Sequence, residues 1–146
     1  MPSLPLNQHT CFALYSASLA MTKVYRPFLA ELGLTYPQYI VMLVLWESVA
    51  PQGVMVSVIG EAVFLDSGTL TPLLKKLELL GFVQRKRSTD DERCVLVQLT
   101  PKGRTLRAKA SHIPACVAQA SACSVAELAD LNGRLQSLRS ALLASS

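Results

Sequence analysis

Residues 57–100 read SVIGEAVFLDSGTLTPLLKKLELLGFVQRKRSTDDERCVLVQLT. Near the middle of this stretch, Asp66 or Ser67 is suited to cap a helix N-terminus, because either side-chain oxygen accepts a hydrogen bond from the unpaired backbone N–H groups there. Four leucines at helical spacing follow and predict one apolar helix face: Leu70, Leu73, Leu74 and Leu77. Gly81 is the expected end of this helix.

A basic β-hairpin is predicted directly after this helix. Strands are expected at residues 82–87 and at 94–99, with a polar tip at 88–92; in the second strand, Val95, Val97 and Leu99 alternate on one face. Ahead of the central helix, residues 57–63 predict a shorter one. This order indicates a mainly α fold with a small β-hairpin wing, which is a winged helix-turn-helix.

The polar side chains of this stretch are candidates for DNA contacts. The second helix suits a major groove, and an Arg-bearing hairpin suits the neighbouring backbone or minor groove. We expect Asp91 to hold the planar guanidinium of Arg93 in place through paired hydrogen bonds. The candidates are Ser67, Thr69, Thr71, Lys75, Lys76, Arg85, Lys86, Arg87, Asp91 and Arg93. The alternative is a small α/β scaffold whose polar helix face is only solvated.

The charge of the chain is unevenly distributed. The 146 residues carry a formal net charge of +4, and ten of the fourteen Lys and Arg residues lie between Lys75 and Lys109. Such clustering suits a polyanion better than a uniform solubilising charge does. The apolar content of 51% is high for a chain with room for one domain, which favours a partner that covers part of it.

Signals for export, membrane insertion and metal binding are weak. The chain opens without the basic start and apolar run of a signal peptide, and its longest apolar run, 39–46, is too short to span a bilayer. We expect a cytoplasmic protein without membrane contact, whose four cysteines are mostly reduced. None of them forms a C-x-x-C pair, and His9 and His112 are the only histidines, so we predict neither a metal nor a cofactor.

Helices are also predicted on both sides of the central stretch. Residues 7–32 carry apolar side chains at helical spacing, and Pro27 is expected to bend or divide that helix. A last helix begins at the S-x-x-E capping box Ser124–Glu127, and its leucines repeat at intervals of 3, 4, 3 and 4 from Leu128 to Leu142. This seam packs against another helix, either within the chain or, as we expect, between the subunits of a homodimer.

The connections between these helices have their own signals. Thr35–Gln38 reads as a T-x-x-Q capping box, and Thr100 before Pro101 reads as the cap of a basic helix that stops near residues 112–114. We therefore predict a single domain, residues 1–146. In it, residues 51–100 bind DNA, and residues 1–50 with 101–146 form a helical dimerisation region.

Four segments resemble a known family. Asp91-x-Arg93 through Leu99-Thr100 resembles the wing signature of the MarR family of dimeric winged-helix repressors. Within that family, CFALY at 11–15, YPQY at 36–39 and LDSGTLTPLL at 65–74 resemble the organic hydroperoxide resistance regulators. The resemblance covers nearly the whole chain. It implies a repressor that binds a palindromic double-stranded operator as a homodimer and is released by organic hydroperoxides.

The resemblance also implies a redox-sensing Cys11 supported by Tyr15, Tyr25 and Tyr36. Cys11 and Tyr15 are neighbours at i and i+4 on one helix. Tyr25 shares that face but lies about 21 Å along the axis at ~1.5 Å per residue, so it reaches Cys11 only across a two-fold dimer with antiparallel first helices. The alternative is that Cys11 is a small buried hydrophobe and that the tyrosines pack in the core.

A second, resolving cysteine is carried by some regulators of this kind. The resemblance places it at Cys116, which follows Pro114, where a helix is interrupted and the backbone is expected to yield. Cys123 is the fallback, and we interpret Cys94, on a wing strand, as structural.

Two other functions stay open at this point. One is a MarR-type repressor controlled by a small aromatic ligand, with Cys11 incidental. The other is a thiol peroxidase, which the absence of C-x-x-C and the presence of a complete DNA-reading unit disfavour. We predict a regulator and not an enzyme.

Overall fold

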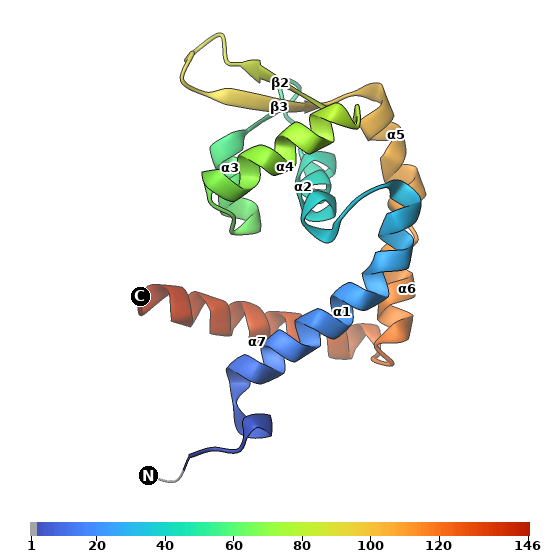
Figure 1. Ribbon diagram of the computed structural model, residues 1–146, viewed down its shortest axis with the longest axis vertical. Helices are drawn as coiled ribbons and strands as arrows, with labels where there is room; N and C mark the ends of the chain where they lie inside the picture. Colours follow the sequence, from blue (N-terminus) through green and yellow to red (C-terminus); the bar gives the residue numbers. More distant parts are fainter. Residues whose placement is uncertain (1–2) are drawn as a thin grey trace. The chain divides into compact units, whose positions relative to one another are not determined.

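The computed structural model describes residues 3–146, and its chain divides into two compact units (Figure 1). The first extends to Ser111 and holds the helix-turn-helix and the wing. The second begins at His112 and holds two helices. The fold is mainly helical with a small antiparallel wing, as the sequence predicts.

The first unit opens with a short turn and a long helix. A 3-10 helix, η1 (Leu6–Gln8), precedes α1 (Thr10–Leu32), which ends at Gly33 in the left-handed conformation with φ +72°. The predicted start at residue 7 was therefore three residues early, because residues 6–8 form a separate turn. Of the two predicted effects of Pro27, division of the helix does not occur, since α1 continues through it.

Helix α2 (Tyr36–Glu47) forms the centre of the first unit. It begins at the predicted capping box, in which the Thr35 side chain accepts from the Gln38 N–H and the Gln38 side chain accepts from the Thr35 N–H. Most of its side chains are buried, and it contacts α1, α3, α4 and β3. A helix that is apolar nearly all round must be covered on all sides, and this explains its central place.

The helix-turn-helix consists of α3 (Val56–Val63) and α4 (Ser67–Leu79). Asp66 caps α4, because its Oδ1 accepts from the Thr69 N–H at 2.8 Å. Leu70, Leu74 and Leu77 are buried as the leucine spacing predicts. The chain leaves α4 through Gly81, whose φ of +84° favours glycine.

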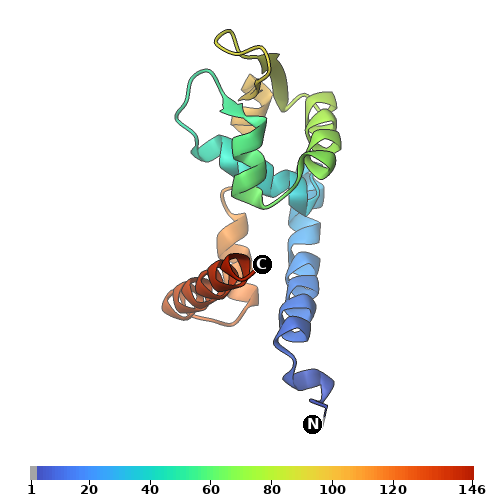
Figure 2. The ribbon, with the colours of Figure 1, turned by 90° about the vertical axis from the view of Figure 1, so that its left-hand side faces the viewer.

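The wing contains one strand more than the sequence predicts. Strands β2 (Val83–Arg87) and β3 (Val95–Leu99) form the expected hairpin, and β1 (Val54–Met55) pairs with the other edge of β3. Figure 2 shows this small sheet beside α3 and α4. The two-residue β1 is too short to show an alternating pattern, so the sequence carries no signal for it.

Helix α5 (Pro101–Ala110) closes the first unit. Thr100 caps it as predicted, accepting from the Gly103 N–H at 3.0 Å. The Trp46 indole donates to the Gly103 carbonyl at 2.9 Å and thereby ties α2 to α5. A Cβ at position 103 would overlap the Phe82 carbonyl oxygen, so only glycine permits this close approach.

The second unit consists of α6 (Ile113–Ala120) and α7 (Val125–Ala144). The break between α5 and α6 lies at residues 111–112, and Pro114 stands in the first turn of α6. Ser124 and Glu127 form the predicted capping box of α7. Along the predicted leucine seam, Leu131, Leu135 and Leu142 are exposed.

Within the described residues, no single helix is both long and apolar enough to cross a membrane. Helices α1 and α2 reach that length and apolarity together, but the chain bends by 69° between them. In the same part of the chain, no three His, Cys, Asp or Glu side chains lie close enough to hold a metal ion.

Candidate redox centre and nucleic-acid interface

Helix α4 presents a polar face opposite its buried leucines. Because Asp66 is the capping residue, Ser67 stands in the first turn with its hydroxyl uncommitted to the cap. Ser67, Thr69, Lys75 and Lys76 are exposed, and Thr71 is partly exposed. The face therefore carries hydroxyl donors at the N-terminal end and two ammonium groups further along, which suits base edges and phosphates respectively.

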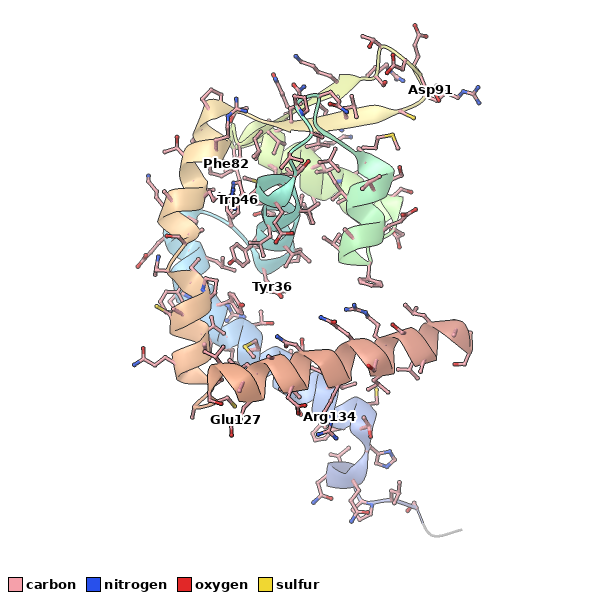
Figure 3. The ribbon with its side chains drawn as sticks, turned by 180° about the vertical axis from the view of Figure 1, so that it is seen from behind. Tyr36, Trp46, Phe82, Asp91, Glu127 and Arg134 are labelled. Carbon is pink, nitrogen blue, oxygen red and sulfur yellow. The ribbon has the colours of Figure 1, made fainter. Side chains whose placement is uncertain are left out.

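The wing tip presents an exposed guanidinium. Figure 3 shows Asp91 at the far end of the hairpin, and the side chain of Arg93 is 95% exposed. Asp91 Oδ1 accepts from the Arg93 backbone N–H at 3.0 Å but lies 3.8 Å from Arg93 Nε. The predicted paired hydrogen bonds are thus wrong: the aspartate fixes the backbone of the tip, and the guanidinium keeps its donors for another partner.

Arg85 does not belong to the exposed cations. Its Nη2 donates to Glu78 Oε1 at 3.2 Å, its backbone N–H donates to Glu78 Oε2 at 3.1 Å, and its Nε is buried without a partner in the described chain. The same hydrogen bonds lower the pKa of the Glu78 carboxyl. Arg85 therefore joins β2 to α4, and its contact with DNA stays a prediction.

The remaining wing cations differ in how much they are held. Lys86 and Arg87 are exposed on β2, and Arg87 Nη1 donates to the Glu92 carbonyl at 2.8 Å, which helps close the tip. A hollow of about 330 Å³ lies between α4 and the wing, and both Thr71 of α4 and Arg93 of the wing line it. The structure thus places the two predicted DNA-contacting elements at one concave surface.

Cys94 lines this hollow at the base of the tip. Its thiol lies 3.7 Å from Asp91 Oδ2 and donates to it. Partial desolvation, followed by the nearby Asp91 charge, raises the pKa of Cys94. A thiol kept protonated is a poor nucleophile, which agrees with a structural role.

Three tyrosines gather where α1 meets α2. The rings of Tyr25 and Tyr36 are 5.1 Å apart edge to face, and Tyr39 lies 5.9 Å from Tyr25 and 6.4 Å from Tyr36. Burial, and then the neighbouring phenols, raise the pKa of Tyr25 to about 12. Tyr25 therefore stays a neutral O–H donor at physiological pH. Sequence reasoning missed Tyr39, although its i+3 spacing from Tyr36 is a usable signal.

Cys11 and Tyr15 lie apart from this cluster. Both are exposed on the first turns of α1, and Tyr15 is 61% exposed. Since α1 is continuous from Thr10 to Leu32, the fourteen residues between Cys11 and Tyr25 span about 21 Å. Within one chain, the structure does not bring the thiol and the tyrosine cluster together.

The two candidate resolving thiols lie in the second unit. Cys116 is partly exposed inside α6, where its N–H donates to the His112 carbonyl at 3.2 Å. It therefore does not stand at a yielding break, contrary to the expectation. Cys123 is exposed in the link between α6 and α7, next to Ala122 with φ +57°. All four cysteines are free thiols.

Known proteins share this arrangement over most of its length. The family model of the transcriptional regulators SarA/Rot matches residues 23–109. The organic hydroperoxide resistance transcriptional regulator of Bacillus subtilis (strain 168) is 44% identical over 135 residues, 92% of this chain and 90% of that protein. The chain belongs to the organic hydroperoxide resistance branch of the MarR family. This confirms the family that the sequence resembles.

Solved structures of the regulator AbfR from Staphylococcus epidermidis also match this MarR-family chain. Reduced AbfR bound to DNA has a TM-score of 0.73 and 31% identity, covering 91% of both chains. Disulfide-formed AbfR has a TM-score of 0.62 and 32% identity, covering 90% of this chain and 86% of the other. These relatives are winged-helix transcriptional regulators, which confirms the prediction of a regulator and not an enzyme.

Proposed function

We propose that this chain is a transcriptional repressor that binds a palindromic operator as a homodimer and is released when an organic hydroperoxide oxidises Cys11. The observation that carries the proposal is the separation of Cys11 from the tyrosine cluster along α1. An exposed thiol at one end of the helix and phenol donors at the other complete one site when two copies of α1 lie antiparallel. Such a regulator works where its operator DNA lies, in the cytoplasm.

The homodimer is supported by apolar surface that the single chain leaves uncovered. Around α1, these exposed side chains are Leu4, Leu6, Phe12, Leu14, Leu19 and Met21. On α7 they are Val125, Leu131, Leu135, Leu142 and Leu143. Exposed apolar side chains in such numbers on a helix favour an interface with another chain. We assign residues 1–50 and 101–146 to dimerisation and residues 51–100 to DNA binding.

The proposed DNA contacts follow from the exposed groups. The face of α4 enters the major groove, and Arg93 at the wing tip reaches the neighbouring minor groove or backbone. In a two-fold dimer the two α4 helices contact half-sites about 34 Å apart, one turn of DNA. Reduced AbfR bound to DNA, a relative with the same fold, supports this role.

The proposed chemistry starts at the Cys11 thiolate. Its sulfur attacks one peroxide oxygen, the O–O bond breaks, and the leaving alkoxide takes a proton to become an alcohol. Cys11 is then a sulfenic acid. The Cys116 thiol of the other subunit attacks this sulfur and releases water, which leaves a disulfide. The disulfide-formed structure of AbfR supports a covalent switch of this kind.

The tyrosines assist as neutral donors in this scheme. Tyr25 and Tyr36 of one subunit and Tyr15 of the other donate O–H groups to the thiolate and then to the leaving oxygen. Because the pKa of Tyr25 is about 12, its phenol keeps its proton throughout the physiological range. The exposed apolar side chains Phe12 and Leu14 beside Cys11 suit a peroxide with a hydrocarbon body.

A gel-shift assay with the DNA upstream of the protein's own gene tests this function. Wild type should release the DNA after one equivalent of cumene hydroperoxide and rebind after dithiothreitol. Cys11→Ser should bind equally well but keep the DNA, because the hydroxyl preserves size and lacks the nucleophile. Cys94→Ser is the matched control and should respond as wild type does. Release of Cys11→Ser by the peroxide, or release reversed by dilution alone, contradicts thiol control.

A further inference from the structure

Tyr39 stands in the middle of a row of aromatic rings, and the chemistry proposed above gives it no role. Its ring centroid lies 5.9 Å from that of Tyr25, 6.4 Å from that of Tyr36 and 6.4 Å from that of Trp46. Tyr36 and Trp46 lie toward opposite ends of α2 (Figure 3). Of the three tyrosines only Tyr39 is buried, with 2% of its surface exposed, so it presents almost no surface to a peroxide that arrives from solvent.

The neighbour of Tyr39 toward the end of α2 is held in place. The rings of Tyr39 and Trp46 meet edge to face, with their planes 68° apart. The Trp46 indole donates to the Gly103 carbonyl at 2.9 Å, and the Trp46 carbonyl accepts from Arg107 Nη1 at 2.9 Å. These bonds fasten the end of α2 to α5. The Tyr39 ring therefore packs against a side chain that is itself fixed.

The two phenols proposed as donors both pack against Tyr39. Tyr25 comes from α1 and Tyr36 from the first turn of α2, and the planes of their rings lie 46° and 49° from that of Tyr39. Aromatic pairs at such distances and tilts are favourable beyond the area that they bury. A buried ring that contacts both donors restricts the orientations that they can adopt. Donors that are already oriented accelerate a reaction, because they need not reorganise as charge develops.

We propose that Tyr39 is a positioning residue for the oxidation of Cys11, whose buried ring holds the phenols of Tyr25 and Tyr36 in the orientation in which they donate. The inference rests on the proposed function, in which these phenols assist the thiolate and the leaving oxygen. Tyr39 acts through its ring and not through its hydroxyl, and it touches neither the sulfur nor the peroxide. The bonds made and broken at Cys11 are those already given, and only the geometry of the proton donors depends on Tyr39.

The test measures the rate constant for oxidation of Cys11 by cumene hydroperoxide in the full chain. Cys116→Ser and Cys123→Ser are present throughout, so that the sulfenic acid persists and dimedone labelling with mass spectrometry counts it. Tyr39→Leu and Tyr39→Met remove the ring, and methionine adapts to the space that is left. Both should react about tenfold more slowly, the scale of one aromatic pair. Tyr39→Phe keeps the ring and should react at close to the wild-type rate.

Two controls separate positioning from a general loss of stability. Val41→Ala is the matched control, because Val41 is fully buried on the same helix and lies outside the aromatic row. It should destabilise the fold and leave the rate constant unchanged. A double-mutant cycle supplies the second control. In a protein that already carries Tyr25→Phe and Tyr36→Phe, Tyr39→Leu should cause little further loss, whereas a purely structural role would slow both proteins equally.

The outcomes distinguish this inference from the function on which it rests. An unchanged rate in Tyr39→Leu and Tyr39→Met, an equal loss in Tyr39→Phe or in Val41→Ala, or an additive cycle overturns the positioning role and leaves the proposed function standing. If Tyr25→Phe with Tyr36→Phe reacts as fast as wild type, assistance by the phenols is refuted and the positioning role with it. A wild-type Cys11 that does not react with the peroxide refutes the proposed function itself.

Discussion

Arg85 and Arg93 are eight residues apart in the same hairpin, yet their side chains lie in different environments. Arg85 is held by Glu78 and partly buried, whereas Arg93 is 95% exposed at the tip and its guanidinium has only a 3.8 Å ion pair with Asp91. The cost of ordering a free guanidinium is offset only when it binds a partner such as a base edge or a phosphate. Among the wing arginines, Arg93 is therefore the one we expect to carry sequence-specific affinity.

Arg93→Ala should weaken operator binding by about 1–3 kcal/mol, the scale of one good specific contact. Lys86→Ala is the comparison, because an exposed lysine on β2 should contribute equally to operator and unrelated DNA and should lower the salt dependence of both. Fluorescence anisotropy at several salt concentrations measures these affinities. An Arg93→Ala variant with unchanged operator affinity in matched salt would show that the wing tip does not contact the operator.

At the scale of secondary-structure elements, α4 and the wing are fastened together and form one proposed DNA-binding surface. The Glu78 carboxylate accepts from both the side chain and the backbone N–H of Arg85, so the last turn of α4 is fastened to β2. Both elements also border the hollow that contains Thr71 and Arg93. Fixing the angle between helix and wing reduces the ordering cost when both contact DNA.

Glu78→Gln should lower the free energy of unfolding at neutral pH by about 1 kcal/mol, the upper range for a partly exposed ion pair. The folded-state pKa of Glu78 is depressed, so its contribution is present above the ordinary glutamate pKa and is lost as the pH falls through the lower folded value. The difference between the two proteins should therefore vanish in acid. Urea unfolding across this pH range measures it, and a difference that persists at low pH contradicts the role of the carboxylate charge.

At the scale of the whole molecule, the proposed switch links Cys11 of one subunit to Cys116 of the other. Cys11 stands in the first unit, while Cys116 and Cys123 stand in the second. Disulfide closure requires Cα atoms within about 7 Å, so oxidation restricts the arrangements that the dimer can adopt. A covalent bond of this kind supplies the free-energy difference that a switch between two dimer states needs.

After one equivalent of cumene hydroperoxide, a non-reducing gel should show wild type and Cys123→Ser as covalent dimers. Cys116→Ser should stay monomeric and carry a sulfenic acid at Cys11 that dimedone traps. A covalent dimer that survives in Cys116→Ser and disappears in Cys123→Ser assigns the resolving role to Cys123, the more exposed thiol. Monomers in every variant would exclude a disulfide between subunits.

The sequence alone determined the helices and the hairpin, because their signals are local. The side chains of Thr35, Asp66, Thr100 and Ser124 all cap the helices that they were expected to start. Buried leucines on α4 and the turn at Gly81 also follow from spacing and from backbone conformation. Capping and periodicity depend on neighbours within one or two turns, so the order of residues suffices to predict them.

Only the tertiary structure decided which polar groups are free to act. Arg85 is basic in the sequence but is paired with Glu78, and Tyr39 lies beside Tyr25 only because α1 packs against α2. The strand β1 forms because it pairs with the free edge of β3. Each of these features depends on side chains distant in the chain, whose proximity is set by packing of the apolar core and not by any local preference.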